Sequence, residues 1–218
     1  MSEASPEVGR VVVGPVESNC WLARRPGADV AVVVDPGADA DRIVSALEDW
    51  GARPEAVLLT HAHMDHVGAV APLVERWELP VHLHPDGRPL YDRASEHARQ
   101  FGLRIPDPPP PDHELGDGDV VEAAGLSFEV RHAPGHSPGG VVLVCGRGAF
   151  VGDCVFQGSV GRVDLPGGDG ARLRRSIEEQ ILTLPDEAAL WPGHGPETTV
   201  GREKTSNPFL TGAVRWGR

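Results

Sequence analysis

The sequence predicts an α/β fold in which two β-sheets stack face to face and helices cover their outer faces, giving four layers. In the first third of the chain, apolar runs typical of strands alternate with segments of helical periodicity. From residue 118 onward come two strand pairs, followed by one more helical segment. Two halves of this similar make-up would stack sheet on sheet, with their helices outside.

The first third contains three runs that are rich in β-branched residues and bounded by turn residues. They predict strands over residues 10–14, 30–37 and 56–61. A helix is expected over residues 39–51, because its apolar side chains share one face: Ile43, Val44, Leu47 and Trp50. Asp39 or Asp41 is the expected N-cap, and Gly51 is the expected stop.

The following segments continue this alternation. A helix is predicted over residues 68–77, and Pro80 then begins a strand over residues 81–84. Residues 88–104 form a polar excursion that is expected to be helical. The segment 106–112 is so rich in proline that it can form neither a helix interior nor a central strand, and we interpret it as a stiff surface connection.

The second half predicts two hairpins and a helix. The strand pairs are residues 120–132, which turn around Gly125, and residues 141–153. The helix is expected over residues 171–184, where the buried stripe consists of Leu173, Ile177, Ile181 and Leu184. The exposed face would carry two ion pairs, Arg174 with Glu178 and Arg175 with Glu179. The length suits a single domain, expected to span residues 1–218.

The composition excludes several classes of partner. The 20 Lys and Arg against 32 Asp and Glu give a net charge of -12, so a groove that neutralises many phosphates would have to form against the overall field. The three cysteines, Cys20, Cys145 and Cys154, lack CxxC spacing, which fits reduced thiols in a cytosol. The sequence has no apolar run of secretory or membrane-spanning length. We therefore expect a cytoplasmic protein that binds neither nucleic acid nor membranes.

The segment THAHMDH, residues 60–66, carries the clearest chemical signal. Imidazole and carboxylate are ligands that suit zinc, iron or manganese. His61 and His63 lie two residues apart on an extended segment, so they can converge on one ion. Asp65 and His66, on the turn that follows, can reach a second ion. A shuffled sequence of this composition would contain H-x-H-x-D-H about once in a thousand, so the segment predicts a pair of metal ions.

Three further residues could complete the sites for two ions. Each follows a predicted strand and lies beside glycine: His136 in APGHSPGG, Asp153 in AFVGDCVF and His194 in LWPGHGPE. Glycine and proline permit tight turns that direct one side chain inward. A carboxylate that ends the apolar run AFVG would lie near the core and need a positive partner. Taken singly, each of the three could equally be an ordinary turn residue.

The ordered motifs H-x-H-x-D-H, P-G-H-S-x-G-G, G-D and P-G-H-G resemble the signature of the metallo-β-lactamase superfamily over nearly the whole chain. The resemblance implies a four-layer αββα sandwich of two mixed β-sheets with helices on the outer faces. Residues 14–22, 35–37 and 158–169 are similar in particular to the glyoxalase II branch, also called hydroxyacylglutathione hydrolase. The closing pattern ExxxNPFL, residues 203–210, resembles the short bacterial and archaeal members that lack a C-terminal helical domain.

The resemblance also implies a role for each candidate ligand. One ion would be held by His61, His63 and His136, the other by Asp65, His66 and His194, and Asp153 would bridge them. Zinc is the expected metal, with iron or manganese as alternatives. A bridging hydroxide would attack a carbonyl carbon while Asp65 orients it, and Asp35 would help to orient the site. A thioester suits this chemistry, because its thiolate departs without a dedicated general acid.

Two departures from the larger glyoxalase II enzymes concern the substrate. Those enzymes carry a lysine and aromatic residues in the loop where this chain has Arg162, Val163 and Asp164, so Arg162 could keep a cationic contact without the aromatic one. They also continue into a helical domain, whereas 24 residues follow His194 here. The expected activity is hydrolysis of a small-molecule thioester, with a glutathione-derived one as the first candidate.

Other activities share this fold. A persulfide dioxygenase would hold one iron through two histidines and an aspartate, and another ester or lactone hydrolase would use the same two ions. A ribonuclease is disfavoured by the acidic balance, an electron-transfer diiron module would replace His63 by Glu, and a non-catalytic metal-binding module would leave no open coordination position. The remaining candidates are interpreted as structural or surface residues: His82, His84, His97, His113, His132 and the thiol of Cys154.

Overall fold

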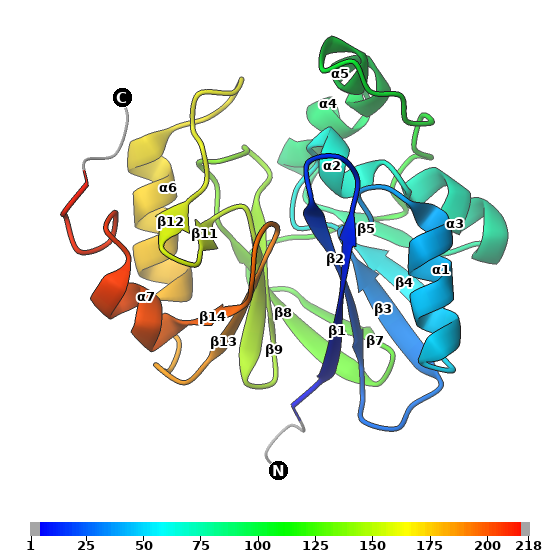
Figure 1. Ribbon diagram of the computed structural model, residues 1–218, viewed down its shortest axis with the longest axis horizontal. Coiled ribbons are helices and arrows are strands. Elements are labelled where there is room, and N and C mark those ends of the chain that lie inside the picture. Colours follow the sequence, from blue (N-terminus) through cyan, green and yellow to red (C-terminus); the bar gives the residue numbers. More distant parts are fainter. Residues whose placement is uncertain (1–4, 215–218) are drawn as a thin grey trace.

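The first of two β-sheets lies on the right of Figure 1, in a computed structural model that describes residues 5–214. Its strands, in spatial order, are β1 Glu7–Val13, β2 Ser18–Arg24, β3 Val30–Val34, β4 Arg53–Leu58, β5 Val81–Leu83 and β6 His113–Glu114. β1, β2 and β3 pair antiparallel, whereas β3 to β6 pair parallel. The sheet is therefore mixed. The domain was expected to span residues 1–218, and of these residues 1–4 and 215–218 lie outside the described part of the chain.

The second sheet faces the first across the middle of the molecule (Figure 1). Its strands, in spatial order, are β14 Thr198–Thr199, β13 Ala189–Pro192, β10 Gly148–Gly152, β9 Val141–Cys145, β8 Leu126–His132 and β7 Val120–Ala123. β10 and β13 pair parallel and the other neighbours antiparallel, so this sheet is also mixed. A separate hairpin consists of β11 Val155–Phe156 and β12 Ser159–Val160.

Helices cover the outer faces of both sheets. The first half of the chain contributes α1 Ala40–Asp49, α2 Met64–Val67, α3 Val70–Trp77, η1 Pro85–Gly87, α4 Arg88–Tyr91 and α5 Ala94–Gln100. The second half contributes α6 Gly170–Ser176, η2 Ile177–Ile181 and α7 Val200–Ser206. Figure 1 shows α1 and α3 outside the first sheet, and α6 and α7 outside the second. The predicted αββα sandwich is confirmed.

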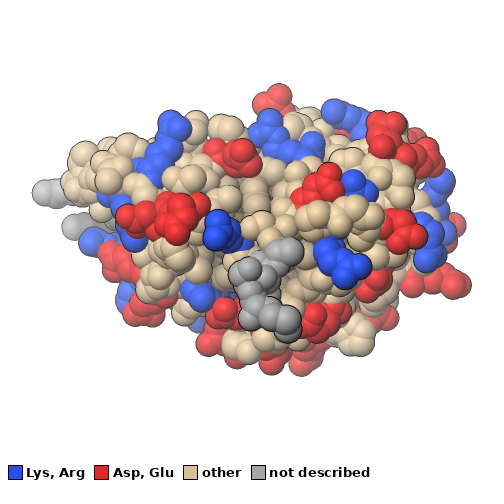
Figure 2. Space-filling model, turned by 90° about the horizontal axis from the view of Figure 1, so that it is seen from below, with Lys and Arg blue, Asp and Glu red and all other residues tan. Residues whose placement is uncertain are grey.

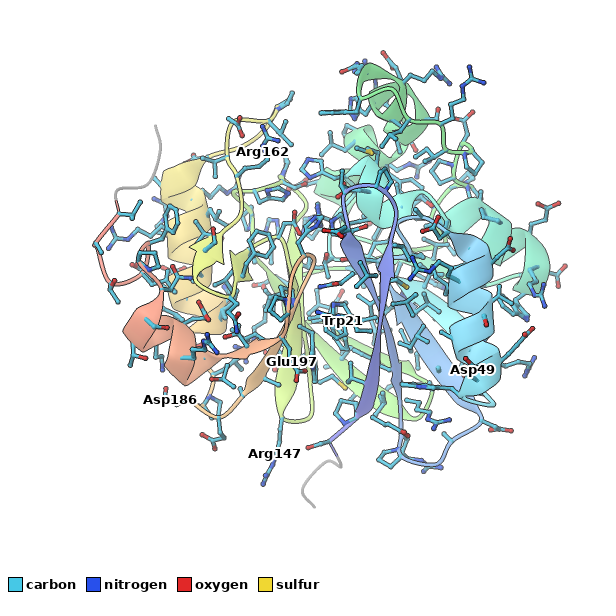
Figure 3. The ribbon with its side chains drawn as sticks, in the orientation of Figure 1. Trp21, Asp49, Arg147, Arg162, Asp186 and Glu197 are labelled. Atoms are coloured by element: carbon cyan, nitrogen blue, oxygen red, sulfur yellow. The ribbon has the colours of Figure 1, made fainter. Side chains whose placement is uncertain are left out.

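Three apolar clusters lie between these four layers. One packs α1 and α3 against the first sheet, and another packs α6 and η2 against the second. The central cluster lies between the two sheets and includes Trp21, which Figure 3 labels at their interface, together with Phe128, Phe150 and Trp191. The Phe150 and Trp191 ring centroids are 4.6 Å apart. Both faces of each sheet are covered, so a central strand has no side chain that faces solvent. The sequence of β3, VAVVV, accordingly contains no polar residue.

Strand β2 was not predicted from its sequence, SNCWLAR. Its apolar side chains alternate between two clusters: Cys20 and Leu22 pack towards α1 and α3, whereas Trp21 and Ala23 pack into the central cluster. Ser18 and Asn19 are also buried, because they bond to loops described below. A strand buried on both faces that begins with two polar residues shows neither alternation nor a continuous apolar run.

The predicted helices form, with two differences. Asp39 occupies the N-cap position of α1 but does not cap it, because its carboxylate instead accepts a hydrogen bond from the Gly14 N–H at 2.9 Å. The helix expected over residues 171–184 is α-helical in α6 and then widens to π-type winding in η2. The predicted pair of Arg174 with Glu178 forms at 2.8 Å.

Both predicted hairpins are present, with tight turns at Ala124–Gly125 and Gly146–Arg147. The three cysteines are buried, and no disulfide links any two of them. Within residues 5–214, no helix has the length and apolar character needed to cross a membrane. On the face shown in Figure 2, acidic and basic side chains are interspersed.

The carboxylate of Glu203, on α7, is buried and joins three separate segments. It accepts hydrogen bonds from the Gly158 N–H at 2.8 Å, the Asn207 amide at 2.8 Å and the Thr198 hydroxyl. Glu203 and Asn207 are both 0% exposed. The closing ExxxN pattern therefore anchors the end of the described chain to β14 and to the turn between β11 and β12.

Candidate metal centre

The seven candidate ligands meet at one edge, where strands from both sheets end. The segment after β4 carries His61 and His63, and α2 carries Asp65 and His66. In the second sheet, β8, β10 and β13 run in the same direction, and the loops after them carry the other three: His136, Asp153 and His194. The carboxyl ends of parallel strands lie at one edge, so residues far apart in sequence converge there.

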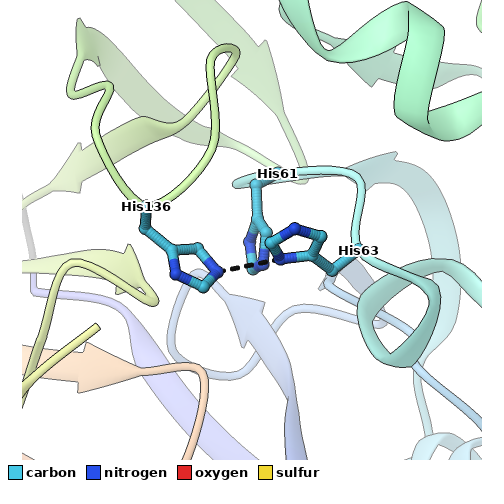
Figure 4. A group of neighbouring side chains, drawn as sticks. All are labelled: His61, His63 and His136. Atoms are coloured by element: carbon cyan, nitrogen blue, oxygen red, sulfur yellow. Dashed lines mark hydrogen bonds between the residues drawn. The ribbon is translucent and has the colours of Figure 1, made fainter. Parts of the chain in front are cut away.

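The first group contains His61, His63 and His136, whose ligand atoms lie within 4.8 Å of one another. Figure 4 shows the three rings directed toward one point from two separate segments. His63 Nδ1 and His136 Nε2 are 2.8 Å apart. His136 Nδ1 donates to the Arg162 carbonyl oxygen at 2.8 Å, which leaves its Nε2 with a free lone pair.

The second group contains Asp65, His66 and His194, again with ligand atoms within 4.8 Å. His194 Nε2 is 3.2 Å from Asp65 Oδ2, and His66 Nε2 is 3.5 Å from the same oxygen. On the other side of its ring, His66 Nδ1 lies 3.2 Å from Asp35 Oδ2. That contact fixes the ring so that Nε2 faces the group.

Asp153 lies between the two groups. Its Oδ1 is 3.5 Å from His66 Nε2, and its Oδ2 is 3.5 Å from His136 Nε2 and 3.6 Å from His194 Nε2. One carboxylate therefore faces histidines of both groups. The position requires the glycine at 193, since a methyl group there would lie 2.1 Å from Asp153 Oδ1.

The charges at the centre favour a cation. Burial lowers the pKa of His66, but the carboxylates of Asp65, Asp153 and Asp35 outweigh it and raise that pKa to about 10. Burial raises the pKa of Asp65, but His66 and His194 outweigh it and hold that pKa well below its ordinary value. In the first group, burial and the neighbouring imidazoles lower the pKa of His61 well below its ordinary value. In the absence of an ion, the Asp65 carboxylate therefore stays ionised, the His61 imidazole stays neutral and the His66 imidazole holds a proton. A divalent ion bound here would displace that proton, because a metal-ligating imidazole must be neutral.

Unpartnered atoms point to the same conclusion. Among the described residues, five buried side-chain N or O atoms have no hydrogen-bond partner, and three belong to this centre: His61 Nε2, His66 Nε2 and Asp153 Oδ1. Buried polar groups without a partner are costly, and natural folds seldom keep them. All three are atoms that coordinate divalent metals, so the residues present fit a metal centre.

Two polar residues of β2, Ser18 and Asn19, hold the ligand loops, although neither was predicted to be a site residue. The Ser18 hydroxyl donates to the Asp65 carbonyl oxygen at 2.7 Å. The Asn19 amide donates to the Pro192 and Gly195 carbonyl oxygens at 2.9 and 2.8 Å, on either side of His194. Ser18 and Asn19 are 0% and 1% exposed.

Asp35 follows β3 and is held firmly in place. It is 1% exposed and accepts hydrogen bonds from the Thr60 N–H at 2.7 Å and from the Thr60 hydroxyl. Its φ of 52° is in the left-handed region, which costs a non-glycine residue about 1–2 kcal/mol. The backbone strain and these bonds direct its carboxylate toward His66, as the predicted orienting role requires.

A cleft with a cavity volume of about 320 Å³ opens onto the metal centre. Its walls contain five of the candidate ligands and the predicted contact residue Arg162. The segment over 88–104 also contributes, through Leu90, His97, Gln100 and Phe101. From the sequence, His97 is interpreted as a surface residue, but in the structure it lines the cleft. Figure 3 shows Arg162 on the loop between β12 and α6.

A further group, His84, Asp86 and His132, also has ligand atoms within 4.8 Å. The His84 and His132 rings are stacked, with centroids 4.0 Å apart and planes 8° apart. An imidazole nitrogen binds a metal ion that lies in the plane of its ring. Two stacked rings therefore cannot both coordinate one ion unless one of the side chains rotates. Here the structural interpretation of His84 and His132 fits the geometry better, and Cys154 is a buried thiol as expected.

The chain is similar to other proteins and to solved structures over most of its length. It is 38% identical over 208 residues to the probable metallo-hydrolase YqgX of Bacillus subtilis, covering 93% of this chain and 97% of that protein. It is 38% identical over 184 residues to the hydroxyacylglutathione hydrolase GloC of Haemophilus influenzae, covering 83% and 87%. The crystal structure of TTHA1623 in a di-iron-bound form superposes with a TM-score of 0.85, at 46% identity over 93% of this chain and all of that one.

The family model of the metallo-β-lactamase superfamily matches residues 13–194, which include the whole metal centre from Asp35 to His194. The fold, the convergence of imidazoles and carboxylates and these similarities agree. The protein is a metallo-hydrolase that belongs to the metallo-β-lactamase superfamily.

Proposed function

We propose that this protein is a thioesterase of the glyoxalase II type that works with two divalent metal ions. His61, His63 and His136 would hold one ion, Asp65, His66 and His194 the other, and Asp153 would contact both. The observation that carries the proposal is the position of the Asp153 carboxylate, within 3.6 Å of histidines from both groups. The 38% identity to a hydroxyacylglutathione hydrolase supports the choice of a thioester.

Divalent ions bound at such a centre lower the pKa of a coordinated water and polarise a carbonyl group. The side chains contribute orientation. Asp65, on the cleft wall, would accept a hydrogen bond from the attacking water and direct its lone pair at the acyl carbon. Asp35 keeps His66 turned toward the centre, and the Arg162 carbonyl does the same for His136.

The leaving group favours a thioester over an amide or an alkyl ester. A thiol has a pKa near 8.5, so the thiolate departs without a proton from the protein. Apart from the candidate ligands, the titratable side chains among the residues that line the cleft are His97 and Arg162. Arg162 keeps its proton at neutral pH and cannot serve as a general acid, so among these lining residues only His97 could protonate the poorer leaving group of an amide or an alkyl ester.

The test is turnover of S-lactoylglutathione by protein loaded in turn with zinc, iron and manganese. Elemental analysis of the same samples gives the number of ions per chain. Turnover with two ions supports the proposal, and no turnover of this or any other thioester with any of the three metals would contradict it. One iron per chain, with oxygen consumed on addition of glutathione persulfide, would instead establish the dioxygenase activity.

A further inference from the structure

The cleft above the metal centre has a mostly apolar wall. Beside the candidate ligands, it is lined by six apolar residues: Val16, Met64, Leu90, Phe101, Leu165 and Pro166. Among the described residues, four large hydrophobic side chains are exposed, and two of these, Phe101 at 58% and Val16 at 44%, belong to this wall. Exposed apolar side chains gathered in a concave site mark a surface that a ligand covers.

The one cationic side chain of the cleft is already neutralised. Among the described residues that line it, the only Lys or Arg is Arg162, and its guanidinium makes two hydrogen bonds of 2.7 Å to the Asp164 carboxylate. The pair is exposed, so its attraction is weak and does not lock either side chain. However, Asp164 is only two residues away on the same loop, so it stays close even when the pair opens. The loop therefore presents no net positive charge to a substrate.

Apart from the proposed metal ions, other charges near the cleft do not provide a cationic site for the thiol part of a substrate. An adjoining cavity of about 250 Å³ shares Val16 and Met64 with the cleft, and it contains one cation, Arg104. The lining of the same cavity also includes two carboxylates, Asp39 and Asp65, so its side chains carry no net positive charge. The net charge of the whole chain, -12, further opposes the approach of an anionic substrate.

We infer that this cleft selects thioesters whose thiol part is uncharged and apolar, held against Phe101, rather than thioesters of glutathione with its two carboxylates. The inference rests on the proposed thioesterase function and narrows its substrate class. In the reaction, water adds its oxygen to the acyl carbon and the C–S bond breaks. The thiolate leaves with the bonding electrons. Of the two protons of the water, one reaches the thiolate through the solvent and the other is released when the carboxylic acid product ionises.

The experiment compares three thioesters with the same lactoyl group. Their thiols are benzyl mercaptan, which is apolar, N-acetylcysteamine, which is neutral and polar, and glutathione, which is charged. We expect kcat/KM for the benzyl thioester to exceed that for the glutathione thioester by about tenfold or more, which corresponds to about 1.4 kcal/mol. N-acetylcysteamine, which lacks both the ring and the charges, should fall between them.

Variants assign the preference to named residues. Phe101→Ala should lower kcat/KM for the benzyl thioester about tenfold and leave the glutathione thioester within about twofold. Asp164→Asn frees Arg162 and should raise kcat/KM for the glutathione thioester about fivefold. Val120→Ala is the matched control, because Val120 on β7 has the same 58% exposure as Phe101 but does not line the cleft.

Binding provides a second readout that does not depend on turnover. Calorimetry with benzyl ethyl sulfide and S-ethylglutathione, neither of which can be hydrolysed, should show tighter binding of the benzyl compound, lost in Phe101→Ala. If the wild-type protein turned over the glutathione thioester as fast as the benzyl thioester or faster, the inference would be overturned, whereas the thioesterase function would stand. Loss of that turnover in Arg104→Gln would then show that a cation near the cleft binds glutathione. Failure of all three thioesters with every metal would overturn both.

Discussion

A methyl group at residue 193 is the most direct test of the metal centre. In Gly193→Ala, the added carbon would lie 2.1 Å from Asp153 Oδ1 and 2.7 Å from His66 Cε1. Non-bonded heavy atoms settle near 3.5 Å or beyond, so the Asp153 oxygen has to move by more than about 1 Å. The backbone at Gly193 does not have a positive φ, so alanine introduces no conformational strain of its own.

The expected result follows from that displacement. Disturbing a group that only orients a metal ligand costs about 10–100-fold in metal affinity, so moving a ligand itself should cost about 100-fold or more. Activity should fall by a similar factor, because a misplacement of 1 Å typically costs about 100-fold in rate. The assay is a competitive chelator titration of the metal-free protein, with kcat/KM measured on the reconstituted enzyme.

Gly195→Ala is the control for this variant. A methyl group at residue 195 meets nothing within 4 Å, but the φ of 72° there disfavours alanine. This change should lower the free energy of unfolding by about 1 kcal/mol and leave metal affinity within about threefold. If Gly193→Ala bound two ions with wild-type affinity, the assignment of Asp153 to both ions would be refuted.

Three further predictions test the centre and the fold around it. Asp153→Ala should reduce the bound metal below two ions per chain and lower kcat by about a thousandfold, measured by elemental analysis and thioester turnover; unchanged activity would exclude a two-ion mechanism. Glu203→Gln places an amide among three donors and should cost about 2–4 kcal/mol in urea denaturation, whereas a loss below about 0.5 kcal/mol would count against the buried carboxylate as an anchor. Burial and the nearby His113 lower the pKa of His82 to about 4, below its unfolded value near 6.5, so the unfolded chain takes up the proton first and stability falls from pH 6.5 to pH 4. His82→Asn should reduce this fall in metal-free protein, and an identical pH profile would disprove the contribution of His82.

The parts of the fold that the sequence predicted are those with strong local patterns. α1 has a clear apolar face, β3 and β4 are bounded β-branched runs, and both hairpins have turn residues at their tips. Strand β2 was not predicted because its side chains alternate between two apolar clusters. One of its faces is buried only because the second sheet packs against it. The N-cap of α1 was misjudged because the Gly14 N–H, 25 residues away, competes for the Asp39 carboxylate.

The candidate site divides in the same way. The candidate ligands could be predicted because metal chemistry restricts both residue type and spacing, as in the segment from His61 to His66. The residues around them could not, because their role depends on distance in space. In the sequence, Ser18 and Asn19 are ordinary polar residues, and their role follows only from the position of β2 beside the His194 loop. In the same way, Phe101 is assigned to the cleft only by the position of the segment around α5.

The two sheets contribute unequal but complementary shares of the metal centre. The segment after β4 of the first sheet provides His61, His63, Asp65 and His66, and the loops of the second sheet provide the rest. Any ion bound here therefore crosslinks two halves of the chain that are otherwise joined by apolar packing, loop hydrogen bonds and one connecting segment. We therefore expect a bound ion to stabilise the interface between the sheets. In metal-starved cells, proteases would first reach the loops at this edge, well before the helices on the outer faces unfold.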